Sequence, residues 1–110
     1  MVPGFLSKAP TLVDGDTVVW ESNTILRYLA AEEGASLTGE TPAGVSHIER
    51  WMDFLLAAVN PGYLAAFKGA KLTPEEQTPE YREQTKDLAA QMAIIDGHLA
   101  GKDFLALGKF

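Results

Sequence analysis

Short apolar runs, interrupted by turn residues, open the chain. Residues 11–13 and 17–20 are apolar and rich in β-branched side chains, and Asp14-Gly15-Asp16 separates them. An Asp-Gly pair between two such runs is typical of a hairpin, because glycine accepts a positive φ. From Ser22, which we predict to be the N-cap, apolar residues recur at helical spacing. The pattern therefore predicts two antiparallel strands followed by a helix over residues 22–31.

Polar turn formers then fill residues 34–44, which predicts a linker, and beyond it the apolar period is helical. Thr41-Pro42 is typical of a helix start. We expect Asn60-Pro61-Gly62 to break or kink this helix, since proline lacks a backbone donor, and helix to resume beyond it. The apolar face that we predict for this helix consists of Val45, Ile48, Met52, Leu55, Leu56 and Val59.

A loop with one helical turn is predicted at residues 68–77, with Thr73 capping against Glu76. Thr78-Pro79 predicts the start of the last helix, and Gly101 is expected to end it. One face of that helix is apolar, so we expect the two long helices to pack together along their apolar faces. The residues of this second face are Tyr81, Leu88, Met92, Ile95 and Leu99.

Composition narrows the class of protein. With 110 residues, 46% hydrophobic and 22% charged, the chain suits one small folded core. Its net charge of −6 argues against nucleic acid and anionic membrane as partners. No apolar run reaches the roughly 18 residues of a membrane span, and the absence of cysteine excludes disulfides and thiolate metal sites. We therefore expect a soluble cytoplasmic protein.

Candidate chemistry is confined to one place. His47 and His98 fall on different predicted helices without metal-ligand spacing, so we expect ordinary side chains and no metal. Residues 8–10 before the hairpin and the pair Glu21-Ser22 at the helix start form the one site that the pattern indicates. A helix N-terminus attracts anions, so Ser22 can receive a ligand carboxylate while Glu21 takes an ammonium group. The alternative is an N-cap serine beside a solvated acid, after a proline that opens an edge strand.

Residues 8–16, Lys-Ala-Pro-Thr-Leu-Val-Asp-Gly-Asp, and residues 20–30 together resemble the glutathione transferase family. The resemblance implies a mainly α fold with one β-hairpin: a partial thioredoxin-like ββα unit at residues 1–35 and an incomplete all-helical domain at residues 41–110.

The same resemblance implies a glutathione site. Pro10 falls on the family's cis-proline, and Ala9 falls on the residue whose backbone pairs with the cysteinyl part of glutathione. Glu21 and Ser22 fall on the pair that binds the γ-glutamyl end. Glutathione is thus expected as a substrate, beside a small electrophile and without a metal.

The chain also departs from the family pattern. The family's β-α-β unit and its catalytic Tyr, Ser or Cys precede the cis-proline strand, where only residues 1–7 stand here. Neither Ser7 nor Tyr28 matches the catalytic position, so the catalytic residue is unknown. The chain thus resembles a truncated transferase that conjugates glutathione to an electrophile if it is active. The alternatives are a non-catalytic helical dimerisation module and a fragment with at most weak glutathione binding.

Self-association is predicted from apolar residues that lack cover. A single helix cannot cover both faces of a hairpin, and without the β-α-β unit a strand edge is also free. A two-fold homodimer that buries the hairpin edge or the outer faces of the two long helices is the simplest way to cover such surfaces. The hairpin residues concerned are Leu12, Val13, Val18, Val19 and Trp20.

Overall fold

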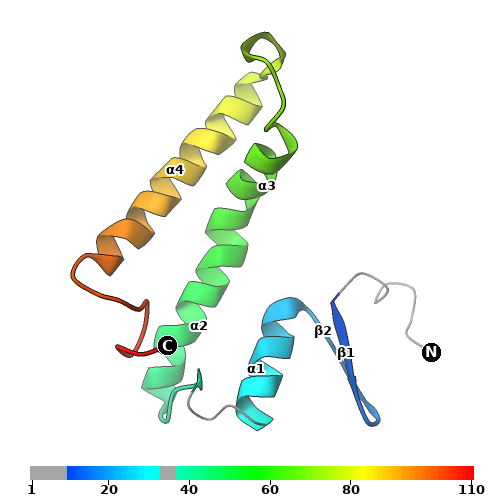
Figure 1. Ribbon diagram of the computed structural model, residues 1–110, viewed down its shortest axis with the longest axis vertical. Coiled ribbons are helices and arrows are strands. Elements are labelled where there is room, and N and C mark those ends of the chain that lie inside the picture. The colour runs from blue at the N-terminus through cyan, green and yellow to red at the C-terminus, as the bar shows by residue number, and fades with distance from the viewer. Residues whose placement is uncertain (1–9, 33–36) are drawn as a thin grey trace. The chain divides into compact units, whose positions relative to one another are not determined.

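The computed structural model describes residues 10–32 and 37–110. Its contacts divide the chain into two compact units, Met1–Val45 and Ser46–Phe110. The first unit holds a hairpin and a helix, and the second is helical (Figure 1). None of the helices in the described ranges combines the length and the apolarity that a bilayer span requires.

The hairpin consists of β1 (Thr11–Asp14) and β2 (Thr17–Trp20), as predicted. The strands are antiparallel with Thr11 opposite Trp20, and Gly15 adopts φ +60° in the turn. Because side chains alternate between the faces of a sheet, Leu12 and Val19 share one face and Val13 and Val18 share the other.

Helix α1 (Ser22–Glu32) follows the hairpin and packs on the face that carries Val19, which is 8% exposed. The Tyr28 hydroxyl donates a hydrogen bond of 2.6 Å to Asp14 Oδ2 and so ties this helix to the end of β1. The prediction of Ser22 as the N-cap was wrong by one position. Ser22 is the first helical residue, and the Glu21 carbonyl accepts from the Ile25 N–H at 2.9 Å. The chain can turn into the helix at this earlier residue because Glu21 adopts a left-handed conformation.

The first long helix is not broken at its proline. Helix α2 (Pro42–Phe54) passes through a π turn, η3 (Leu55–Val59), into α3 (Asn60–Lys68) (Figure 1). The Asn60 N–H bonds to the Leu55 carbonyl in the wider π pattern. This turn lies directly before Pro61, whose ring would crowd the preceding turn of a regular helix. At its start, α2 is capped by Thr41 Oγ1, which accepts from the Gly44 N–H at 3.1 Å.

The second long helix, α4 (Pro79–Leu99), begins where it was predicted and runs antiparallel to α3 (Figure 1). Thr78 Oγ1 caps it by accepting from the Tyr81 N–H at 3.0 Å. Before it, the short 3-10 turn η4 (Pro74–Glu76) has the predicted capping box, with the Thr73 hydroxyl donating to Glu76 Oε1 at 2.8 Å.

Two glycines let the backbones of the helical unit approach closely. A Cβ on Gly62 would lie 2.7 Å from Leu88 Cβ and 2.8 Å from the Gln84 carbonyl oxygen. A Cβ on Gly69 would overlap the Tyr81 ring. α4 therefore packs mainly on α3 and the π turn, along the face that includes Leu88 and Tyr81.

Few apolar side chains of these helices are fully buried. Val59 is buried, but three residues assigned to the predicted apolar faces, Leu55, Leu56 and Met92, are about half exposed. That part of the prediction was wrong. Leu55 and Leu56 lie within the π turn, which changes the helical register after Phe54, whereas the exposure of Met92 on α4 has no such explanation.

Candidate functional site

The predicted site lies at the open end of the hairpin. Thr11 pairs with Trp20 in the last rung of the ladder, so Pro10 and Glu21, the next residues outward, leave the hairpin at the same end. Ser22 follows as the first residue of α1. The structure thus brings three of the four predicted site residues to one end of one unit. Ala9, the fourth, lies outside the described residues, as does the Ala9–Pro10 bond.

Glu21 has an unusual backbone conformation. Its φ is +72°, in the left-handed region that favours glycine. A side-chain-bearing residue held there costs about 1–3 kcal/mol, and such strain is commonly found at ligand-binding positions. The sequence pattern missed this feature. A glutamate placed directly between a strand and a helix start, with no residue left for a turn, was the available signal.

The helix start offers unsatisfied donors beside an acid. The first N–H groups of any helix precede its first intrahelical bond and carry the positive end of the helix dipole. Ser22 is exposed, and within the described ranges its hydroxyl makes no hydrogen bond. Glu21 is likewise exposed. A carboxylate and an ammonium group of one ligand can therefore be received side by side at this position.

A hydrogen bond between Tyr28 and Asp14 joins α1 to the hairpin and so helps to position the site. The hydrogen bond to Asp14 is the main cause that raises the pKa of Tyr28 from 10.0 to about 12, because an ionised phenol could no longer donate to the carboxylate. The bond holds the helix that carries Ser22 against the hairpin. Sequence reasoning did not connect these residues, which lie in different elements and are not part of a recognisable motif.

The two histidines were predicted to be ordinary side chains on separate helices. The structure brings both to one hollow in the helical unit, His47 from α2 and His98 from α4. Among the described residues, no three His, Asp or Glu side chains gather in a way that could hold a metal ion.

Comparisons with known proteins agree with this architecture. Residues 3–31 match the family model for the glutathione S-transferase N-terminal domain. Glutathione S-transferase GstB from Escherichia coli K12 is 34% identical over 94 residues, covering 79% of this chain and 43% of that protein. Elongation factor 1-gamma 3 from Oryza sativa subsp. japonica is 43% identical over 102 residues, covering 91% of this chain and 24% of that protein.

The fold has a solved counterpart. Glutathione S-transferase 1-6 from Anopheles dirus species B superposes with a TM-score of 0.79 at 22% identity, over 96% of this chain and 51% of that chain. The present chain spans about half the length of the transferases that it matches, or less. The matched N-terminal model and the related sequences together show that the chain belongs to the glutathione transferase family.

Proposed function

We propose that the chain binds glutathione at the open end of its hairpin and acts as a glutathione transferase on a small electrophile. The observation that supports this is the meeting of a strained, exposed Glu21 with the first turn of α1. The Glu21 carboxylate pairs with the γ-glutamyl ammonium group. Ser22 donates its hydroxyl and backbone N–H to the γ-glutamyl carboxylate, where the helix dipole adds to the attraction.

The cysteinyl part of glutathione lies against Ala9 in this proposal, with the Ala9–Pro10 bond in the cis form. Both assignments rest on the resemblance to the family. Pro10 precedes β1 directly, at the same end of the hairpin as Glu21, which suits a ligand that extends from the helix start toward the strand entry. In the reaction, the glutathione thiolate forms a bond to the electrophilic carbon, and the leaving group departs with its electron pair.

Glutathione affinity tests the site. We expect Glu21→Gln and Ser22→Ala each to weaken glutathione binding about tenfold, because each removes one charge-assisted contact. Matched controls are Asp16→Asn, which removes an acid at the turn of the same hairpin, and Thr24→Ala, which removes a neighbouring hydroxyl on α1. Titration calorimetry at a temperature where all variants are folded measures the difference. Unchanged affinity in both site variants rules out the site.

An activity assay separates the transferase from the non-catalytic alternative. Conjugation of glutathione to a chromogenic electrophile by the wild-type chain, reduced in Glu21→Gln, supports the proposed reaction. Glutathione binding without conjugation supports the alternative, a helical dimerisation module that keeps the head-group site. If the chain neither binds nor conjugates glutathione, both hypotheses are contradicted.

We also propose a homodimer, supported by an uncovered apolar face of the hairpin. Val13, Val18 and Trp20 share the face opposite α1 and are 60%, 43% and 45% exposed. A second copy is the simplest cover for this face. Light scattering should give twice the chain mass of 11.9 kDa. The variant Val13→Lys/Val18→Lys should be a monomer. Glu83→Gln/Asp87→Asn on α4 raises the net charge by the same two units and serves as the charge control. A wild-type monomer at micromolar concentration contradicts the dimer.

The cellular location is a further part of the proposal. A cysteine-free chain suits the reducing cytoplasm, where glutathione is kept as the thiol that the reaction consumes. Fractionation of cells that express the protein, with a cytoplasmic marker as the reference, tests this placement. Recovery with a membrane or secreted fraction contradicts it.

A further inference from the structure

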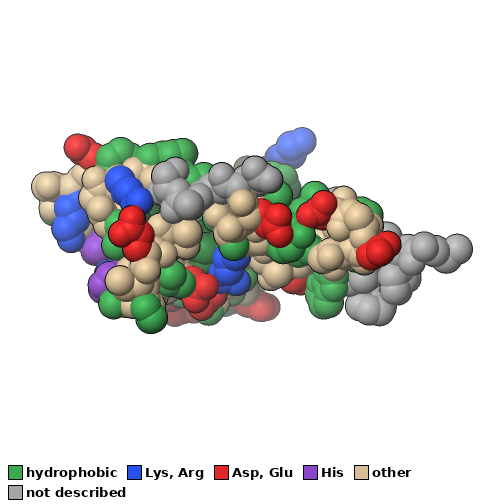
Figure 2. Space-filling view, turned by 90° about the horizontal axis from the view of Figure 1, so that it is seen from below, with side chains coloured by type: hydrophobic (Ala, Val, Ile, Leu, Met, Phe, Trp, Pro, Cys, Tyr) green, Lys and Arg blue, Asp and Glu red, His purple; other side chains and the backbone are tan. Residues whose placement is uncertain are grey.

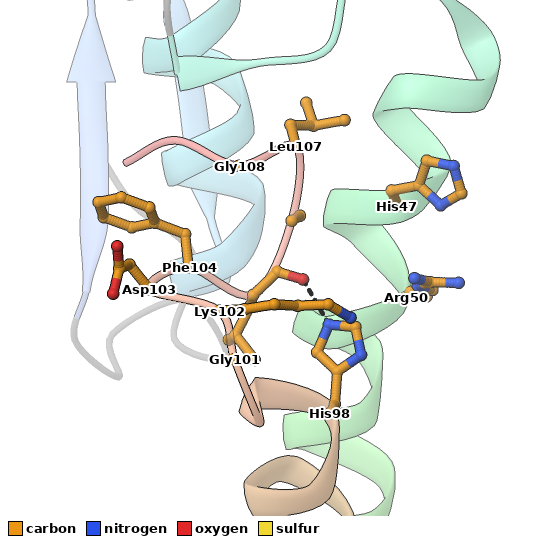
Figure 3. Close-up of a pocket in the computed structure, with 11 residues that line it drawn as sticks. His47, Arg50, His98, Gly101, Lys102, Asp103, Phe104, Leu107 and Gly108 are labelled. Carbon is orange, nitrogen blue, oxygen red and sulfur yellow. Dashed lines mark hydrogen bonds between the residues drawn. The ribbon is translucent and has the colours of Figure 1, made fainter.

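A hollow of about 560 Å³ opens in the helical unit. Three segments line it: the first half of α2, the end of α4 and the glycine-containing tail that follows α4. It gathers four basic side chains, namely His47, Arg50, His98 and Lys102. Figure 3 shows His47 and Arg50 on α2, the Lys102 side chain extending from the tail toward the His98 ring, and the Asp103 carboxylate on the side away from α2.

This concentration of positive charge contrasts with the rest of the molecule. The chain has 9 Lys and Arg against 15 Asp and Glu, yet both of its histidines and two of its basic residues meet here. Figure 2 shows the two histidine side chains close together, with basic side chains beside them. In the described part of the chain, the side chains of His47, Arg50 and Lys102 have no ion pair or hydrogen bond. Their donors are therefore available to a ligand.

The wall of the hollow is held in place by His98. Its Nε2 lies 2.6 Å from the Leu105 carbonyl oxygen, and since a carbonyl only accepts, Nε2 donates. The ring also packs against Trp51, with 4.4 Å between the centroids. Gly101 and Gly108, both at positive φ, let the tail fold back over α2 so that Lys102 joins the cluster.

We propose that this hollow binds the phosphate group of a small organic phosphate monoester. A dianion satisfies Arg50 and Lys102 together, and the guanidinium of Arg50 matches two oxygens of a phosphate. The ring N–H of His47 supplies a further donor. Carboxylates carry less charge on one centre and match this cluster of cations less well.

An adjoining recess accommodates the organic part of the ligand. It has a volume of about 330 Å³ and is lined by Trp51, Phe54 and Ile94, and it shares Arg50 and His98 with the basic hollow. The two rings of Trp51 and Phe54 pack edge to face at 5.6 Å. A flat or apolar group attached to the phosphate can contact this aromatic wall while the phosphate stays among the cations.

Side-chain signals of the two histidines provide a direct test on the full chain. We titrate the full chain with inorganic phosphate and follow both rings by NMR. Both should shift saturably. Chloride at the same ionic strength should leave them unchanged. Equal shifts with chloride overturn the proposal, since they show screening alone.

Variants then identify the residues responsible. Arg50→Gln/Lys102→Gln should weaken phosphate binding by about tenfold or more. The control Lys71→Gln/Lys86→Gln removes the same charge from outside the hollow and should bind as the wild type does. Wild-type affinity in the Arg50/Lys102 variant, with normal helix content, overturns the site. Phenyl phosphate should bind more tightly than inorganic phosphate, and succinate more weakly than either. Succinate binding as tight as phosphate overturns the ligand class.

Discussion

Each of the two units of this protein is stabilised internally, and the two rely on opposite kinds of contact. In the hairpin unit, side chains make the contacts: Val19 is buried under α1, and Tyr28 reaches across to Asp14. In the helical unit, the decisive positions lack a side chain, since Gly62 and Gly69 let backbone and ring atoms of α4 come close. A unit that depends on side-chain contacts loses stability when a side chain is truncated. A unit that depends on close backbone approach loses stability when a side-chain atom is added at the contact.

The largest effect is expected from Gly62→Ala, which adds an atom where the helices touch. The new Cβ would lie 2.7 Å from Leu88 Cβ, so the helices must separate. Overpacking of this kind costs about 1–3 kcal/mol. Gly97→Ala is the matched control, because a Cβ there meets nothing within 4 Å and lies in a helix. The control should gain about 0.5–1 kcal/mol. Chemical denaturation measures both, and equal values for the two contradict the close-approach argument.

Val19→Ala tests the opposite mode in the hairpin unit. It removes buried methyl groups from the contact with α1 and should lower the free energy of unfolding by about 1–2 kcal/mol. Val13→Ala makes the same chemical change on the other face, where the side chain is 60% exposed. At a protein concentration too low for the proposed dimer to form, its effect should stay within about 0.5 kcal/mol. If the two variants unfold at the same denaturant concentration, α1 does not cover the face that we describe.

The helix starts offer a finer comparison. Helix α4 is capped by the side chain of Thr78, whereas α1 begins after a left-handed Glu21. Thr78→Ala should cost about 1 kcal/mol through the lost cap. Thr85→Ala is the control, since its hydroxyl donates only to the Arg82 carbonyl within α4. Thermal unfolding of both variants checks this, and a loss in Thr85→Ala as large as in Thr78→Ala contradicts the capping role.

The smallest effect concerns Tyr28 and appears only in alkali. Its pKa is raised from 10.0 to about 12 in the folded protein, so folding favours the protonated phenol. The contribution of the Tyr28–Asp14 bond is therefore complete below pH 10 and declines as pH rises through about 12. The stability difference between wild type and Tyr28→Phe should follow this decline. In an Asp14→Asn background the pH dependence should largely vanish, and a decline that persists there contradicts the assigned partner.

Prediction from sequence worked best where a few neighbouring residues decide the structure. The hairpin, its turn, the Thr73–Glu76 capping box and the start of α4 after Thr78 were all predicted from local patterns, and each occurs as expected. Turn and cap geometry depends on backbone groups within a few residues, so spacing alone predicts it. The site residues Pro10, Glu21 and Ser22 were also found in this way, although their binding role stays a prediction.

Contacts between distant residues were harder to predict. The apolar faces were assigned on the assumption of an unbroken α-helix, and the π turn before Pro61 moved Leu55 and Leu56 into partial exposure. The spacing of hydrophobic residues does not reveal that one helical turn contains an extra residue, as the π turn does. The left-handed Glu21 was missed for a related reason, because a side chain type does not report the strain that its surroundings impose.

By itself, the sequence determined the order of the elements, most of their ends and the location of the candidate glutathione site. Those features follow from local propensity, glycine and proline positions, and a matching family motif. Only the tertiary structure decided that Tyr28 bonds Asp14, that Gly62 meets α4, and that both histidines share one basic hollow. The physical reason is that these contacts join residues far apart in the chain, and their positions depend on how the helices pack and where the tail folds back.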